Sequence, residues 1–440
     1  MLLRRLPLAA ILALVTPPLV TPSAAEPAPA PAPAPLIGGL SPVDAAFDIR
    51  LDLLLNEKSP AAAFAFVSKE FARDPRPHVQ ARYAEFLIEG HDWGAPDGMA
   101  EQGIALAREA RGKGSLHALR IIGWDLVTGR HSARNPALGV VFLRQAATAG
   151  NANAMISLGD VYLRGIGVPV DLTSAEAWFL RAAWQGKPHS LFRLAEAYEH
   201  LTPPNPAKAA MLCYEAASRG SGSAWKHLEE RVAQNDPAAT RVSQLYLLSR
   251  AVLGADYTTK KVRTALAGLE TNYPQDPLAL LAVGRLYASG RYVTIDLKKA
   301  RACFERAAAL GSDDAQADLA QLYAEGRGVP KDPDRAVATW RELAAKDNAC
   351  ALAWLGYYSY WGSLGADHLP KDAAQAFAYC VRAADLGDVH GQCNAGACHE
   401  FGIGTPVDYA LAAHYYRSAA WRGERRSNEQ LPKLLRAVLR

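Results

Sequence analysis

A small residue followed three positions later by tyrosine recurs along this chain about every 36 residues. The clearest copies are Gly159 with Tyr162, Ala195 with Tyr198, Gly284 with Tyr287, and Ala320 with Tyr323. Weaker copies centre on Ala84, Gly123, Gly356 and Gly396. A fixed period of this size is typical of stacked supersecondary units. The sequence therefore predicts a repeat array and not a conventional globular enzyme.

Each repeat is predicted to contain two helices, as residues 153–186 illustrate. Leu158, Gly159 and Tyr162 have helical spacing, and a central glycine would let a second helix approach closely. Gly165 then ends the first helix, because glycine suits the left-handed C-terminal position. An aspartate that could cap the second helix follows the central residue by 12 positions in four copies. These pairs are Gly159/Asp171, Gly284/Asp296, Ala320/Asp332 and Gly396/Asp408.

The full pattern resembles the Sel1-like repeat, a relative of the tetratricopeptide repeat. Its elements are small-x-x-Tyr, Gly-x-Gly-Val, Asp, and Ala-x-x-Trp-x-x-x-Ala-Ala-x-x-Gly. The best copies are 154–186, 315–345 and 390–423, with partial copies at 276–311, 351–387 and 191–220 and two degenerate ones within 78–150. The resemblance implies an all-α fold: a right-handed superhelical solenoid of antiparallel helix pairs. It also implies a non-catalytic scaffold that binds proteins.

The period and its interruptions divide the chain into six predicted segments. The spacing rises to 89 residues between Ala195 and Gly284, which leaves room for a degenerate unit near Ser243 and Tyr246 and an added helix around 224–234. We expect a bend or a boundary between two half-solenoids there. The segments are a signal peptide (1–25), an Ala/Pro-rich linker (26–40), N-terminal helical repeats (41–222), a degenerate repeat with an extra helix (223–275), C-terminal repeats (276–426) and a capping helix (427–440). The cap is expected because Leu431, Leu434, Leu435, Val438 and Leu439 share one helical face.

The N-terminus has the features of a secretory signal. Arg4 and Arg5 precede an apolar run at 6–15, and small residues at 23–25 suit a signal peptidase. The run is shorter than the roughly 20 residues of a membrane-spanning helix. We therefore expect cleavage, no stable membrane insertion, and a periplasmic or secreted protein. An uncleaved anchor is the alternative.

Charge and motifs indicate no catalytic site, cofactor or metal. The net charge is +4 without a basic cluster, so no nucleic-acid partner is expected. Phosphate-loop, His-Glu-x-x-His and Gly-x-Ser-x-Gly motifs are absent from the sequence. His390, Cys393, Cys398 and His399 could suggest zinc, but on one helix they point in divergent directions.

Ser223 and Lys226 match Ser-x-x-Lys, the nucleophile motif of penicillin-binding enzymes. The accompanying Ser-Asp-Asn and Lys-Thr-Gly motifs are missing. A periplasmic penicillin-recognising hydrolase is therefore kept only as an alternative function.

Six cysteines in an exported chain raise the question of disulfides. Cysteine-rich members of the resembling family pair cysteines within each repeat, a spacing that is absent here. Buried thiols are the simpler interpretation for Cys213 and Cys303. For the last four, Cys350, Cys380, Cys393 and Cys398, one bridge stays open, with Cys380–Cys393 as an example. A Cys393–Cys398 bridge is disfavoured because the two side chains point about 140° apart on one helix.

Aromatic residues gather on one predicted first helix, at 351–361. Trp354, Tyr358 and Trp361 form a stripe at helical spacing, away from the face that the repeat's own core uses, and Tyr357 points further away. First helices of tetratricopeptide-like repeats tend to line the concave surface. We therefore predict a protein-binding site at Trp354, Tyr357, Tyr358 and Trp361. Packing against the neighbouring repeat is the alternative.

These features predict an exported, non-catalytic scaffold for protein–protein interaction. The resemblance implies a role in envelope assembly, signalling or polysaccharide export. The alternatives are the hydrolase at Ser223 and a carbohydrate-binding solenoid that uses the Trp354 stripe.

Overall fold

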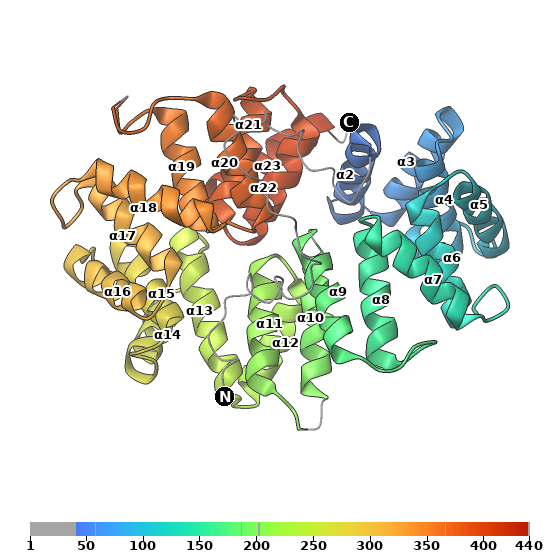
Figure 1. Cartoon of the computed structure of the whole chain (residues 1–440), viewed down its shortest axis with the longest axis horizontal. Helices are drawn as coiled ribbons and strands as arrows, with labels where there is room; N and C mark the ends of the chain where they lie inside the picture. Colours follow the sequence, from blue (N-terminus) through green and yellow to red (C-terminus); the bar gives the residue numbers. More distant parts are fainter. Residues whose placement is uncertain (1–40, 58, 186, 201–202, 366, 439–440) are drawn as a thin grey trace, which may run out of the picture. The chain divides into compact units, whose positions relative to one another are not determined.

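The computed structural model describes residues 41–438 except 58, 186, 201, 202 and 366. These residues form 22 α-helices and one 3₁₀ helix, and no strand occurs among them. Helices adjacent in sequence pack against each other as successive pairs (Figure 1). The predicted all-α class and helical repeat solenoid are confirmed. The predicted signal peptide, the linker and Leu439 lie outside the described residues.

The helices are short and similar in length. The first group is α2 (Pro42–Glu57), α3 (Pro60–Arg73), α4 (Pro77–Glu89), η2 (Gly90–Trp93), α5 (Ala100–Gly112), α6 (Leu116–Thr128), α7 (Pro136–Thr148), α8 (Ala152–Arg164), α9 (Leu172–Trp184), α10 (His189–Glu199) and α11 (Pro206–Ser218). The middle group is α12 (Gly222–Ala233), α13 (Pro237–Leu253) and α14 (Thr259–Asn272). The last group is α15 (Pro277–Ser289), α16 (Leu297–Ala309), α17 (Asp313–Glu325), α18 (Pro333–Ala345), α19 (Ala349–Trp361), α20 (Ala373–Asp385), α21 (Val389–Phe401), α22 (Tyr409–Trp421) and α23 (Arg425–Val438).

The predicted aspartate caps are confirmed. Asp171, Asp296, Asp332 and Asp408 stand at the N-caps of α9, α16, α18 and α22, and each accepts a backbone N–H from the first turn. Gly165 ends α8 in the left-handed conformation, with φ of 67°. The sequence offset missed Asp372, which caps α20 in the same way after a longer loop.

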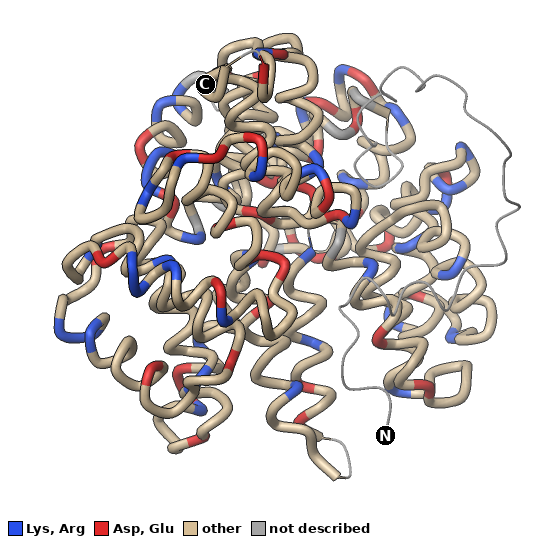
Figure 2. The backbone as a smooth tube through the Cα atoms, turned by 60° about the vertical axis from the view of Figure 1, so that its left-hand side comes forward, with Lys and Arg blue, Asp and Glu red and all other residues tan. Residues whose placement is uncertain are grey.

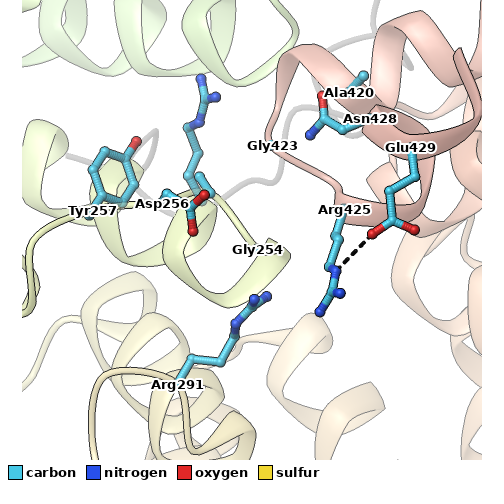
Figure 3. A pocket seen from close by; sticks show the side chains of 11 residues that line it. Gly254, Asp256, Tyr257, Arg291, Ala420, Gly423, Arg425, Asn428 and Glu429 are labelled. Atoms are coloured by element: carbon cyan, nitrogen blue, oxygen red, sulfur yellow. Dashed lines mark hydrogen bonds and ion pairs between the residues drawn. The ribbon is translucent and has the colours of Figure 1, made fainter. Parts of the chain in front are cut away.

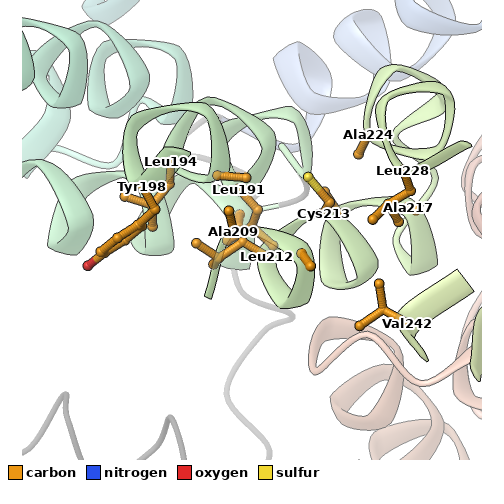
Figure 4. Close-up of a cluster of buried hydrophobic side chains, with 14 of the residues drawn as sticks. Leu191, Leu194, Tyr198, Ala209, Leu212, Cys213, Ala217, Ala224, Leu228 and Val242 are labelled. Carbon is orange, nitrogen blue, oxygen red and sulfur yellow. The ribbon is translucent and has the colours of Figure 1, made fainter. Parts of the chain in front are cut away.

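The central glycine of a repeat lies directly against its second helix. A Cβ on Gly159 would be 2.8 Å from the Phe179 ring, and one on Gly284 would be 2.6 Å from the Phe304 ring. Alanine, leucine and aromatic side chains fill the remaining space, as in the cluster around Leu194 and Cys213 (Figure 4). Close helix approach at a small residue therefore sets the geometry of each pair.

Three helices occupy the interruption in the repeat. Helix α12 spans the expected region, and the longer α13 and α14 follow it before the period resumes at α15. At the C-terminal end, α23 buries Leu431 and Leu434 against α21 and α22. The sequence did not indicate that α2 joins the same cluster through Ile49 and Leu53. The Arg417 guanidinium of α22 also donates to the Asp52 carbonyl of α2, at 3.2 Å.

Candidate interaction groove

An open groove of about 780 Å³ runs along helices from the middle and the C-terminal repeats. Its walls come mainly from α11, α13, α15, α17, α19 and α21, and from the connection between α22 and α23. In the C-terminal repeats these are the first helix of each pair, as expected for the concave side of such an array. We call this cavity the central groove.

Apolar side chains form part of the lining of the central groove. They include Leu245, Leu281, Ala282, Ala353 and Val389, and most of these are buried in the cores of their repeats. The groove wall is therefore continuous with the packed interior of the solenoid. A surface of this kind holds its shape before any partner arrives, which lowers the entropic cost of binding.

A half-buried ion pair crosses from one repeat to the next within the groove. The Arg285 Nε atom lies 2.5 Å from Asp318 Oδ2, and the Cys350 thiol donates to Asp318 Oδ1 at 3.5 Å. Burial alone would lower the pKa of Arg285. The nearby negative charges, with that of Asp318 foremost, together have the larger effect and hold the pKa of Arg285 well above its usual range. Burial raises the pKa of the Cys350 thiol, so this sulfur is a neutral packing group and not a nucleophile.

The polar lining of the groove, this ion pair included, carries both signs of charge. The arginines are 219, 250, 285, 327, 422 and 426, and the carboxylates are 215, 314, 318, 325, 388 and 424. Both signs are also interspersed along the chain as a whole (Figure 2). A mixed-charge, partly apolar groove matches a polypeptide that carries both kinds of charge.

The structure separates the four predicted site residues. Trp354 and Tyr357 line the central groove. Tyr358 is only 3% exposed, stacks on Trp340 at 5.2 Å, and donates its hydroxyl to Glu325 at 2.9 Å. Trp361 is 56% exposed and is not part of the groove lining. The four residues thus do not form one surface, and the binding site itself stays a prediction.

Trp354 is the central aromatic residue of the groove wall. The His390 ring, on the neighbouring helix α21, stacks on the Trp354 indole with ring centroids 6.5 Å apart. The Tyr357 ring meets the Trp354 indole edge-on. The indole Nε1 atom is buried, yet it has no hydrogen-bond partner among the described residues. A buried N–H donor without an acceptor costs free energy, and the exposed part of Trp354 offered to the groove is its ring and not this nitrogen.

The sequence analysis did not identify the charged residues of the groove, although the spacing of opposite charges along the chain indicates them. Arg285 and Asp318 are 33 residues apart, and so are Arg193 and Asp160, which pair at 2.7 Å. Opposite charges separated by about one repeat therefore mark side chains that meet between successive first helices.

The sequence also raised Ser223 with Lys226, and the cysteines, as groups of interest. Ser223 and Lys226 are exposed on α12, and neither lines the central groove. All six cysteines are free and buried, so a Cys380–Cys393 bridge is not formed. The Cys380 thiol instead meets that of Cys398, which raises the pKa of Cys380.

Among the described residues, no cluster of His, Cys, Asp or Glu is arranged to hold a metal ion. None of the helices in the described part combines the length and hydropathy needed to cross a bilayer.

Comparison with known families finds the Sel1 repeat in seven segments. These are residues 127–151, 152–187, 188–221, 277–312, 313–347, 351–388 and 389–423, more than half of the chain. They overlap every strong or partial copy found in the sequence and omit the whole irregular region from α12 to α14.

The chain is also similar to two fungal proteins. It is 26% identical over 299 residues to "Chitin synthase regulator SKT5" of Saccharomyces cerevisiae, covering 66% of this chain and 40% of that protein. It is 38% identical over 80 residues to "Chitin synthase regulatory factor 3" of Schizosaccharomyces pombe, covering 18% of this chain and 8% of that one. The chain thus spans less than half of either relative.

Two solved structures resemble the chain at low similarity. A protective antigen of uropathogenic Escherichia coli with an SLR fold aligns over 90% of this chain and 83% of its own, with 20% identity and a TM-score of 0.30. A Sel1 repeat protein from Oxalobacter formigenes aligns over 88% and 94%, with 22% identity and a TM-score of 0.27.

Proposed function

The chain belongs to the Sel1 repeat family, and from this premise we propose that it is an exported scaffold that holds a protein partner in the central groove. The observation that carries the proposal is the groove wall at Trp354 and Tyr357, where aromatic surface lies beside paired charges. Aromatic residues in a preformed concavity are the usual anchors of protein interfaces. The export part rests on the signal-like sequence at 1–25.

The partner proposed is a component of a complex that assembles or exports an envelope polysaccharide. The two fungal relatives are named as regulators of a polysaccharide-synthesising enzyme, which supports this class of partner over others. Catalysis by the chain itself is not part of the proposal, since the relatives carry the names of regulators.

Site-specific photocrosslinking in cells tests the groove directly. A photoreactive phenylalanine analogue replaces Tyr357, which is 40% exposed in the groove. The matched control places it at Tyr409, which is 49% exposed on α22 and is not part of the groove lining. We expect one protein to crosslink at position 357 and not at 409. Equal labelling from both positions would contradict a groove-specific partner.

Substitution in the groove provides the second arm of the test. Trp354→Ala with Tyr357→Ala should weaken capture of that crosslinked partner by at least about tenfold, the effect of losing an aromatic anchor. Trp361→Ala is the control, because Trp361 is an exposed aromatic residue of the same helix that lies outside the groove lining. Loss of the partner in the Trp361 variant alone would move the site to the outer end of α19.

A carbohydrate ligand is the second candidate, and the aromatic wall at Trp354 and Tyr357 favours it. Sugar rings pack on aromatic faces and offer hydroxyl acceptors. Glycan-array binding that disappears in Trp354→Ala, with helicity unchanged, would support this function. Binding to no glycan on the array would remove it.

A further inference from the structure

A second cavity, of about 700 Å³, lies where the middle helices meet the C-terminal helix (Figure 3). Its lining comes from the end of α13 and the loop after it, from the loop after α15, and from α22 and α23. Three arginines, Arg250, Arg291 and Arg425, come to this cavity from these three parts of the chain. We call it the arginine pocket.

Two glycines let the guanidinium groups approach the backbone. A Cβ on Gly254 would be 2.7 Å from Arg291 Nη1 and 2.9 Å from Arg425 Cβ, so the Arg291 guanidinium and the base of the Arg425 side chain both lie against this glycine. A Cβ on Gly423 would be 3.3 Å from Arg250 Nε. Both glycines have positive φ, 114° and 91°, which other residues adopt only with strain. The pocket therefore depends on glycine at two positions.

The lining of the pocket has three arginines and two carboxylates, Asp256 and Glu429, and therefore one net positive charge. Glu429 pairs with Arg425 at 3.0 Å. Within the described part of the chain, Arg291 makes no side-chain ion pair or hydrogen bond, and Asp256 makes no ion pair. Arg250 donates from Nη1 to the Tyr246 hydroxyl at 2.8 Å, but its buried Nε has no acceptor among the described residues. Within the described residues, the Arg291 guanidinium is thus unpaired in the cavity, whereas the Arg250 Nε atom is buried against the protein.

We propose that the arginine pocket binds the phosphate group of a small molecule. Guanidinium groups bind phosphate oxygens through paired, charge-assisted hydrogen bonds, and an oxyanion between them would relieve the repulsion of like charges. The cavity is larger than one phosphate, and Tyr257 and Asn428 supply polar groups for the rest of a ligand. This site is separate from the Trp354 wall, so it does not depend on the proposed partner.

Calorimetric titration of the whole chain with inorganic phosphate at low ionic strength tests the proposal. We expect saturable binding to one site, weakened at least about tenfold by Arg291→Gln, since one charge-assisted contact is lost. Arg341→Gln, at an exposed position on α18 outside the pocket, should bind as the unmodified chain does. Phosphate binding that both variants retain equally, or no saturable binding, would overturn the proposal.

A gain-of-binding variant removes the ambiguity of a folding defect. Asp256→Asn deletes a competing carboxylate and should tighten phosphate binding several-fold. A parallel arm with phosphatidylglycerol vesicles separates free phosphate from a lipid headgroup. Binding to vesicles without binding of inorganic phosphate would overturn a small-molecule site and indicate a membrane surface.

Discussion

The central glycine is the point at which the two helices of a repeat come closest. In Gly284→Val, the new Cβ would meet Phe304 ring atoms at 2.6 and 2.8 Å, and the ring is buried. Either the ring or helix α16 must move. Overpacking of this kind costs about 1–3 kcal/mol. We expect the urea midpoint of unfolding to fall, measured by circular dichroism.

Gly112→Ala is the matched control, because its added methyl would have no heavy atom within 4 Å. Gly112 ends α5 without positive φ, so alanine should leave stability unchanged or raise it by up to about 1 kcal/mol. Equal destabilisation by both substitutions would show that close helix approach at Gly284 is not what limits stability.

Tyrosine three positions after the small residue has a further role that the sequence pattern did not specify. Tyr198, Tyr287 and Tyr323 each carry a cation over the ring, from Lys208, Lys299 and Arg335 of the following helix, at 4.1, 4.4 and 4.0 Å. The period identified the tyrosines, but their partners lie on the second helix. Only the folded pair shows that a cation and an aromatic ring connect the two helices.

Three helices of the N-terminal repeats are joined by a buried ionic network. Asp48 of α2 contacts His78 at 3.0 Å and Arg82 at 3.2 Å, both on α4. Glu85 of α4 lies 2.6 Å from Arg82 and 2.9 Å from His117 of α6. Because such a network is buried, its protonation is coupled to whether these helices stay packed.

The network predicts loss of stability in acid. Burial lowers the pKa of His117 from 6.5 to about 4, although Glu85 opposes this. The folded state therefore binds fewer protons than the unfolded state between these values. Stability should fall as the pH drops from about 6.5 to 4, by up to about 3 kcal/mol from this residue. Urea unfolding at pH 7.5, 5.5 and 4.5 measures the slope.

His117→Gln should reduce that slope, because glutamine does not titrate and can still donate to Glu85. The slope will not vanish, since burial also lowers the pKa of His414 to about 4. His131→Gln, at an exposed position, is the control and should keep the full dependence on pH. An unchanged slope in His117→Gln would remove His117 as the source.

Helix pairing was predictable from the sequence because each repeat carries its own caps and its own central small residue. The aspartate offset located α9, α16, α18 and α22, and it failed at α20 only because the preceding loop is longer. The aromatic stripe on α19 was harder to interpret. Its periodicity describes one helix, whereas the Trp340 ring that covers Tyr358 comes from α18. Contacts of that kind depend on the neighbouring repeat.

The arginine pocket and the contacts of α2 bring together residues that are even further apart in the sequence. Arg250 and Arg425 belong to different parts of the array, and no spacing within one repeat relates them. Helix α2 begins the described chain, yet Ile49 and Leu53 pack with Tyr416 and Leu431 at its other end. In a linear repeat array each unit contacts only its neighbours. Contact between α2 and α22 therefore couples units that are distant in sequence.

This coupling can be measured by comparing two leucines on the same helix. Leu53 packs with α21, α22 and α23, whereas Leu51 packs with Val67 and Phe86 of α3 and α4, and both are 0% exposed. Truncation of either should cost about 2–5 kcal/mol locally. By hydrogen-exchange mass spectrometry, Leu53→Ala should lower protection in α22 and α23, and Leu51→Ala in α3 and α4. If Leu53→Ala affected only the N-terminal helices, the two ends would be energetically independent and α2 would stabilise the N-terminal repeats alone.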